Sequence, residues 1–237
     1  MKNWDNLEPD IYKLMNKHFT HGRRMKLDRI YIHHNAGVLT VDDIWRVWQD
    51  RQASAHYQIT PSGLIGQLVN DVDTAWHAGN ETENNRSIGI EHSNIAGPNY
   101  PISEKTREEG AHLVAAICHY YKLGRPAWRV NVFPHSDASS TGCPGRLAPN
   151  GEYGAAYIKR AQDWYDSISK GNKPVDNNNK APSQLDRIEN RTTDIWLQQG
   201  NGNGYTGFEQ GGNRSLYDLM AAVGEKLGIS GCRDTKK

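Results

Sequence analysis

The chain has 237 residues, of which 36% are hydrophobic and 23% charged, and its formal net charge is +1. This composition is ordinary for a soluble globular protein, and without a long basic block it gives no reason to expect nucleic-acid binding. No run approaches the roughly 18 apolar residues of a membrane-spanning helix, and residues 1–9 lack the apolar stretch of a signal peptide. We therefore expect a protein made in a cytoplasm that neither inserts into a membrane nor binds nucleic acid.

The first predicted strand covers residues 28–33, where apolar and polar side chains alternate. Alternation is typical of a strand whose two faces meet different environments. Because side chains two residues apart share a face, Ile30, Ile32 and His34 lie on one face. His33 lies on the other, and it is the better candidate for a position open to a site.

A helix and a hairpin are predicted next. Thr40 can cap a helix that ends near Arg51, because the apolar residues between them recur at helical spacing. Residues 55–60 and 64–69 are predicted as two strands. They flank a turn sequence at residues 61–63 that contains proline, serine and glycine, so the whole segment has the layout of a β-hairpin.

Residues 87–92 are predicted as a further alternating strand, with Ser87, Gly89 and Glu91 on one face. Because glycine has no side chain, we expect Gly89 to leave room beside Glu91 for a ligand. Glu91 is therefore a candidate for a carboxylate that faces a site.

Three more elements complete the first part of the chain. Ser103 begins a helix that is predicted to end at Gly124 and to bury Cys118 in the core. Residues 128–133 are predicted as a strand, and residues 153–169 as the last helix. Strands that alternate with helices indicate an α/β fold, here a central mixed β-sheet flanked by helices.

The composition changes near residue 171, where a polar stretch rich in asparagine and proline begins. Such a stretch is typical of a linker. We therefore expect an N-terminal domain over residues 1–170, a linker over 171–182 and a small C-terminal region over 183–237. A region of that size would struggle to fold alone, so we expect it to dock, to oligomerise or to remain partly mobile.

His135 and Cys143 enclose a short polar loop, and together with the distant His33 they offer three metal ligands. The chain has three cysteines, an odd number without disulfide-type spacing, so Cys143 is expected to be available as a thiolate. Two imidazoles and one thiolate can hold one zinc ion and leave its fourth position open, which is typical of a catalytic zinc. Glu91 could approach the same position.

Five motifs follow one another along the chain: Ile32–Asn35, Ser54–Tyr57, Trp76–Gly79, Asn85–Glu91 and His135–Pro144. In this order they resemble the zinc-dependent N-acetylmuramoyl-L-alanine amidases. These form the type-2 amidase and peptidoglycan-recognition-protein superfamily, which includes many bacteriophage endolysins. The resemblance covers roughly residues 25–165 and implies cleavage of the amide between the lactyl group of N-acetylmuramic acid and L-alanine.

The resemblance assigns the zinc ligands to His33, His135 and Cys143. Recognition proteins that have lost catalysis typically lack the cysteine, so its presence favours an active enzyme. Glu91 matches the general base of one branch of the family. Thr141 matches a position associated with stabilising the transition state, although a hydroxyl at that place could also serve only to fix the loop.

Other family members use a tyrosine on the neighbouring strand, at the place where this chain carries Ala55. Tyr57 lies two residues away, so an alternative alignment keeps it open as a proton-transfer or substrate-contacting group. The resemblance also implies substrate-groove positions beside the metal. These positions are Trp76, His77, Asn85 and His34. Trp76 could equally belong to the core, and His34 could instead support a ligand or pack below the sheet.

The leading functional interpretation is a phage endolysin that lyses the cell wall by cutting bacterial peptidoglycan. It would wait in the host bacterial cytoplasm until a membrane-permeabilising partner such as a holin releases it, and residues 183–237 would bind the wall or oligomerise. One alternative is a cytosolic amidase that recycles muropeptides, which needs no wall-targeting region. The other is a non-catalytic peptidoglycan-binding module, which the intact ligands and Glu91 argue against.

Overall fold

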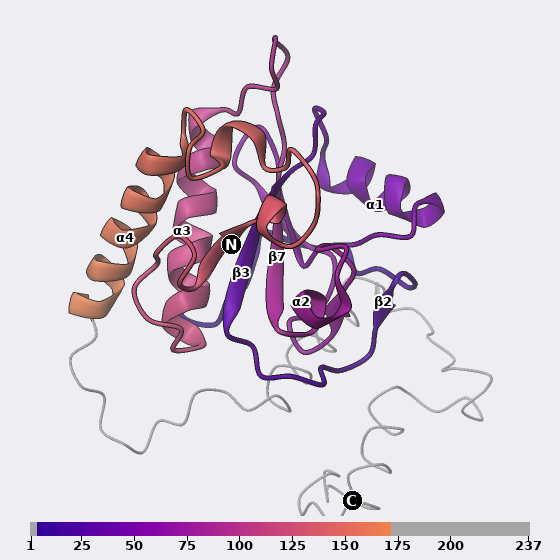
Figure 1. Cartoon of the computed structure of the whole chain (residues 1–237), viewed down its shortest axis with the longest axis horizontal. Coiled ribbons are helices and arrows are strands. Elements are labelled where there is room, and N and C mark those ends of the chain that lie inside the picture. The colour runs from indigo at the N-terminus through magenta and orange to yellow at the C-terminus, as the bar shows by residue number, and fades with distance from the viewer. Residues whose placement is uncertain (1–3, 172–237) are drawn as a thin grey trace, which may run out of the picture. The chain divides into compact units, whose positions relative to one another are not determined.

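The computed structural model describes residues 4–171 (Figure 1). The predicted linker, apart from its first residue, and the predicted C-terminal region at 183–237 lie outside these residues, and both stay predictions. In chain order the strands are β1 (Ile11–Tyr12), β2 (Phe19–Thr20), β3 (Arg29–His34), β4 (Tyr57–Ile59), β5 (Ile65–Gln67), β6 (Thr74–Ala75), β7 (Ser87–His92) and β8 (Val132–Pro134). The α-helices are α1 (Val41–Asp50), α2 (Glu81–Asn85), α3 (Glu104–Tyr120) and α4 (Gly154–Gly171), and two short 3₁₀ helices are η1 (His135–Asp137) and η2 (Gly145–Leu147).

Six strands form one mixed sheet in the order β1-β5-β4-β7-β3-β8. Strand β3 lies between β7 and β8 and runs parallel to both, whereas β4 and β5 form the predicted antiparallel hairpin. Strands β2 and β6 pair separately as a small antiparallel ribbon. The sheet with its flanking helices confirms the predicted fold class.

One face of the sheet is apolar and is covered by α3 and α4, which lie together on the same side of the sheet in Figure 1. Ile30 and Ile32 of β3 and Ile88 and Ile90 of β7 are fully buried in this core. The same cluster contains Leu113 and Ile117 of α3 and Tyr157 and Ala161 of α4. The alternation in the two predicted strands therefore has its expected cause, because the isoleucines occupy every second position and share one face.

A second apolar cluster forms around α1. Thr40 caps this helix as predicted: its hydroxyl accepts from the Asp43 backbone N–H, and the Asp43 carboxylate accepts in return from the Thr40 backbone N–H. This reciprocal arrangement satisfies two N–H groups at the helix start and fixes where the helix begins. Ile44 and Trp48 then point into the cluster.

The predicted strand at residues 128–133 is shorter than expected, because only its end belongs to β8. Arg129 has a positive φ of 59°, a left-handed conformation that a strand cannot contain. Asn131 stabilises the irregular backbone, since its side-chain amide donates to the carbonyl oxygens of Leu123, Gly124 and Arg125. The side-chain pattern does not reveal this turn.

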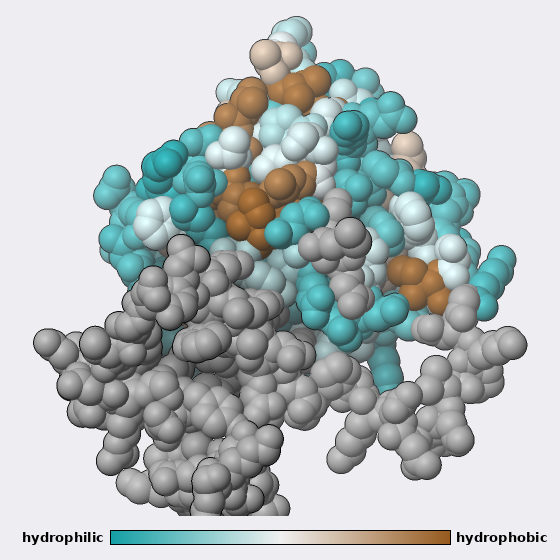
Figure 2. Space-filling model, turned by 180° about the vertical axis from the view of Figure 1, so that it is seen from behind, coloured by the Kyte–Doolittle hydropathy of each residue, from teal (hydrophilic) through white to brown (hydrophobic). Residues whose placement is uncertain are grey.

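On the face drawn in Figure 2, apolar residues gather in small patches separated by hydrophilic ones. Among the described residues, no helix has the length and apolar character needed to cross a membrane.

Candidate metal centre and active site

The three predicted ligands meet at the end of β3. One ligand atom each from His33, His135 and Cys143 lies within 4.8 Å of the others. The Nδ1 atom of His33 is 3.8 Å from the Cys143 Sγ, and the rings of His33 and His135 are 4.4 Å apart between centroids. His33 faces this cluster and His34 does not, as the alternation of the strand predicts.

The sheet and one loop bring these ligands together. Strand β8 runs parallel to β3 and pairs Pro134 with Ile32, so His135 emerges beside His33. The loop then folds back, because the Ser136 backbone N–H donates to the Cys143 carbonyl oxygen over 2.9 Å. Ligands that are distant in sequence thus become neighbours through one parallel strand pair and one closed loop.

The chemistry of these three groups fits a zinc ion. Two imidazole nitrogens and one thiol form a donor set that zinc takes in catalytic sites. Burial lowers the pKa of His33 well below its usual value, and it also lowers the pKa of His135, so both rings are neutral as metal ligands must be. Burial raises the pKa of the Cys143 thiol, and a bound cation would favour the thiolate instead.

Glu91 stands beside the ligand cluster because β3 and β7 pair His33 directly with Glu91. The Asn35 side-chain amide donates to Glu91 Oε2 over 2.9 Å, and Gln58 holds Asn35 by donating to its Oδ1 over 2.7 Å. Burial raises the pKa of Glu91 to about 7, while the Asn35 hydrogen bond acts in the opposite direction. A carboxyl group with this pKa can both accept and release a proton near neutral pH.

The sequence from residue 23 to residue 146, more than half of the chain, matches the family described as N-acetylmuramoyl-L-alanine amidase. The chain belongs to this family. No curated protein matches the chain closely enough to count as a relative.

Solved structures with the same fold agree with this membership. PlyL is 20% identical over 65% of this chain and 96% of its own, with a TM-score of 0.53. A mutant endolysin from Bacillus subtilis is 21% identical over 65% of this chain and 99% of its own, with a TM-score of 0.52. The Staphylococcus aureus hydrolase AmiA is 16% identical over 72% of this chain and 91% of its own, with a TM-score of 0.53. At these identities the likeness establishes the amidase fold.

The space above Gly89 is not open to a ligand, which corrects the expectation from the sequence. The ring of His77 fills it: a Cβ atom at position 89 would lie 2.5 Å from the His77 Cγ. His77 is buried, and its Nδ1 is 3.1 Å from the Nε2 of His33. The predicted groove residue therefore contacts a candidate metal ligand.

Tyr57 lies on the wrong face of the sheet for either role considered from the sequence. In the pairing of β4 with β7 it is opposite Ile90, whereas Gln58 is opposite Glu91. Tyr57 is fully buried in the apolar core, and its hydroxyl donates to the Asp71 carboxylate over 2.8 Å. The amidase fold therefore leaves Glu91 as the proton-transfer candidate on the metal side.

Asn85 is also a structural residue and not a groove wall. It is buried, and its Oδ1 accepts from the Arg24 backbone N–H over 3.0 Å. Its amide nitrogen donates to the Glu81 carbonyl oxygen over 3.0 Å. The Asn85 side chain thus joins the backbone at Arg24 to α2. The neighbouring Asn84 accepts hydrogen bonds from the backbone N–H groups of His77 and Ala78, beside the candidate ligands.

Trp76 and His34 are the two remaining groove candidates, and both are at least partly exposed. Trp76 is 36% exposed, and its indole N–H donates to the Thr20 hydroxyl over 3.0 Å. His34 is half-buried, and its Nδ1 accepts from Asn94 over 3.3 Å. A contact of either residue with substrate stays a prediction.

Thr141 is exposed on the loop that carries Cys143, and its hydroxyl oxygen accepts from the Cys143 backbone N–H over 3.2 Å. The predicted loop-fixing contact of the Thr141 hydroxyl is therefore confirmed. The hydroxyl proton remains able to donate to another group, so this contact is compatible with a second role toward substrate.

Three further residues belong to the site but are not among those predicted from the sequence: Asn35, Gln58 and Asn84. Alternation along β3 places Asn35 on the same face as His33, which is a signal for the first of them. Gln58 and Asn84 have no such signal, because their roles depend on the pairing of β4 with β7 and on the position of α2.

Proposed function

We propose that this chain is a zinc-dependent N-acetylmuramoyl-L-alanine amidase that hydrolyses the amide between N-acetylmuramic acid and L-alanine in bacterial peptidoglycan. The observation that carries the proposal is the meeting of His33, His135 and Cys143 beside the Glu91 carboxyl group in a member of this family. Three ligands with a nearby proton-transfer group suit hydrolysis better than a purely structural metal.

His33, His135 and Cys143 would hold one Zn²⁺ and leave a position open to substrate and water. When bound, this ion supplies Lewis acidity that polarises the scissile carbonyl and makes water a better nucleophile. The neutral state of the two buried imidazoles prepares the protein for the ion, since neither ring must lose a proton first.

Glu91 would accept a proton from the attacking water as the water oxygen bonds to the carbonyl carbon. It would then give that proton to the alanine nitrogen as the carbon–nitrogen bond breaks, because an amine leaves poorly without protonation. The Asn35 hydrogen bond orients the carboxylate for both transfers. Thr141 would donate a hydrogen bond to the developing oxyanion, an interaction worth about 2.7–4 kcal/mol where a comparable donor has been removed.

We further propose that this activity serves cell-wall lysis by a phage endolysin. The protein would stay in the host bacterial cytoplasm until a partner such as a holin permeabilises the membrane, and residues 183–237 would direct it to the wall or make it oligomerise. Family membership and the endolysin fold support this role. A muropeptide-recycling amidase and a peptidoglycan-binding module are the competing outcomes of the test.

The test is digestion of purified cell wall and of a defined soluble muropeptide, with mass analysis of the products. An amidase releases new alanine amino termini without new reducing sugar ends, whereas new reducing ends would identify a glycosidase and contradict the proposal. Activity on the muropeptide alone would support recycling, and binding without cleavage would support a recognition module. In the same assay, replacing the proposed ligand by Cys143→Ala should abolish cleavage. The control is Cys118→Ala, which removes a thiol in the apolar core away from the site.

A further inference from the structure

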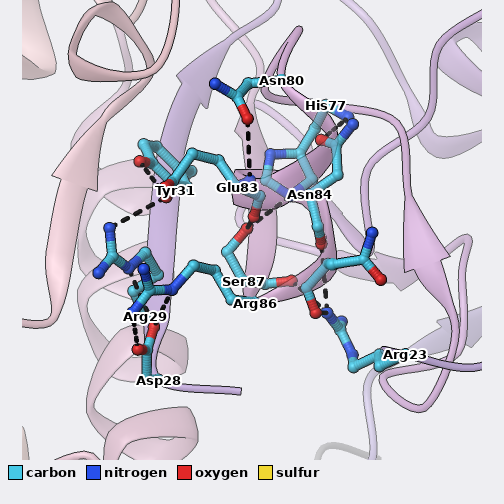
Figure 3. Close-up of polar contacts among 11 residues, drawn as sticks. Arg23, Asp28, Arg29, Tyr31, His77, Asn80, Glu83, Asn84, Arg86 and Ser87 are labelled. Atoms are coloured by element: carbon cyan, nitrogen blue, oxygen red, sulfur yellow. Dashed lines mark hydrogen bonds and ion pairs between the residues drawn. The ribbon is translucent and has the colours of Figure 1, made fainter. Parts of the chain in front are cut away.

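We propose that His77 and Asn84 are positioning residues of the metal centre. The segment formed by His77 and Ala78, held by Asn84, fixes the tautomer of His33, so that its Nδ1 is bare toward the ion, and the same segment contacts the ring of His135. This inference rests on the proposed zinc site, but its first test does not require zinc. Figure 3 shows His77, Asn84, Ser87 and Glu83 gathered around α2.

The two nitrogens of His33 have different surroundings. Nδ1 is directed toward the Cys143 Sγ, 3.8 Å away, while Nε2 is 3.1 Å from the Nδ1 of His77. A neutral imidazole carries one proton, and the nitrogen that binds a metal must be the one without it. His33 can therefore serve through Nδ1 only if its proton is on Nε2.

The far end of a hydrogen-bond chain determines where that proton is (Figure 3). The Glu83 backbone carbonyl can only accept, so the Ser87 hydroxyl donates to it. The Ser87 oxygen then accepts from the Nε2–H of His77, at 3.1 Å. With its proton on Nε2, the Nδ1 of His77 accepts from His33, and this leaves the His33 Nδ1 bare.

Burial keeps both imidazole rings neutral. His33 is 2% exposed and His77 is 8% exposed, and burial disfavours a charged imidazolium in both rings. Each ring therefore has one proton. Because the hydrogen-bond chain ends at a carbonyl oxygen, each nitrogen in it is fixed as either a donor or an acceptor. The direction of these hydrogen bonds follows without any assumption about the metal.

The next residue serves the other histidine ligand. The Ala78 backbone carbonyl accepts a hydrogen bond from the His135 ring. The Ser139 hydroxyl is also 2.9 Å from the Nε2 of His135. Two consecutive residues, His77 through its side chain and Ala78 through its backbone, thus contact the two imidazole ligands.

Asn84 holds that segment in place. Its Oδ1 accepts from the His77 backbone N–H at 3.0 Å (Figure 3). The same oxygen accepts from the Ala78 backbone N–H at 2.7 Å. Asn84 is buried, and α2, which carries it, is capped by Asn80. Because Gly89 has no side chain, the His77 ring packs directly against its backbone. Loss of residues that hydrogen-bond to metal ligands and orient them in this way typically changes metal affinity by about 10–100-fold.

The first experiment measures the tautomers in the metal-free, full-length chain by two-dimensional NMR of ¹⁵N-labelled histidine side chains. We expect His33 and His77 both to carry their proton on Nε2. A proton on the Nδ1 of His33 would overturn the inference, whether or not the protein binds zinc.

The second experiment measures zinc affinity by competition with a chelator. His77→Leu fills the buried space without an acceptor and should weaken zinc binding by about 10–100-fold. His77→Asn places an amide oxygen near the former Nδ1 and should recover most of that loss. His112→Leu, which removes a ring stacked on Trp164, is the matched control. Equal zinc affinity in His77→Leu and the wild type would overturn the inference.

A second pair of variants covers the case in which His77→Leu does not fold. Asn84→Ala removes the acceptor for both backbone N–H groups, whereas Asn84→Asp keeps one of nearly the same shape. We expect weaker zinc binding in Asn84→Ala, with recovery in Asn84→Asp, and equal binding in both would contradict the role of Asn84. If the wild-type chain binds no zinc, the proposed function loses its metal, while the tautomers still decide the hydrogen-bond chain.

Discussion

The two faces of β3 and β7 have opposite chemistry although they belong to the same strands. On one face, Ile30 and Ile88 are fully buried under α3 and α4 and need only apolar neighbours. One residue further along each strand the side chains belong to the other face. At the ends of the strands that face carries His33 and Glu91, which depend on hydrogen bonds to particular partners. Apolar packing is non-directional, whereas each polar contact requires one atom at one distance.

The difference between the faces is therefore one of tolerance. The apolar face can lose or exchange a methyl group and remain an apolar face, at a cost in stability. The polar face loses its chemistry when a single atom is removed. Substitutions on the two faces should accordingly separate stability from activity, and the following experiments test that separation in order of decreasing effect.

Removing a metal ligand should have the largest effect. Cys143→Ala leaves two imidazoles, which bind zinc far more weakly than three ligands do. We expect loss of stoichiometric zinc in elemental analysis and loss of detectable cell-wall hydrolysis. The apolar core does not contain Cys143, so the far-ultraviolet circular dichroism of the metal-free variant should match that of the metal-free wild type. Full activity in this variant would contradict the ligand set.

Removing the carboxyl proton acceptor should have the next largest effect on rate. Glu91→Gln keeps the size and the Asn35 contact but cannot accept the proton, so kcat should fall by about 100- to 10,000-fold. Zinc content should stay at that of the wild type, which distinguishes this variant from Cys143→Ala. Glu104→Gln, which changes an exposed carboxylate at the start of α3, is the control and should retain full activity.

The apolar face was predictable from the sequence because its signal is periodic. Alternation in β3 and β7 and the Thr40 cap depend on residues that are close together in the chain, and the structure contains them as expected. The same periodicity assigned His33 to the site. A signal that depends only on local spacing survives folding, because the backbone period itself is fixed by covalent geometry.

The polar face was predictable only in part, because strand register and loop packing decide it. Tyr57 was a site candidate until the pairing of β4 with β7 placed it opposite Ile90. The expected space for a ligand at Gly89 is absent, because the ring of His77 fills it. Asn85 and Asn84 are adjacent, and only the position of α2 determines which of them supports the ligands. The sequence contains no periodic signal for such contacts.

A large-to-small change on the apolar face should reduce stability without changing the chemistry. Ile88→Ala removes a fully buried side chain and should lower the free energy of unfolding by about 2–5 kcal/mol. Denaturant unfolding measures this change. Zinc affinity and kcat of the folded protein should stay at the wild-type values, and a selective loss of either would contradict the separation of the two faces. Val47→Ala, on the exposed side of α1, should change stability by no more than about 0.5 kcal/mol.

The smallest expected effect is a change in pH dependence caused by the Asn35 hydrogen bond. Glu91 must be unprotonated to accept a proton, and its pKa is raised to about 7, so kcat/KM should rise with pH through this range. The Asn35 N–H stabilises the carboxylate, and Asn35→Ala should therefore raise the pKa of Glu91 further. The acid limb should move upward by about one pH unit, because a hydrogen bond to a charged group contributes about 1.5–3 kcal/mol and water replaces part of it. Activity would then fall about 10-fold below pH 7 and recover at higher pH, whereas superimposable profiles would show that Asn35 does not tune this carboxyl group.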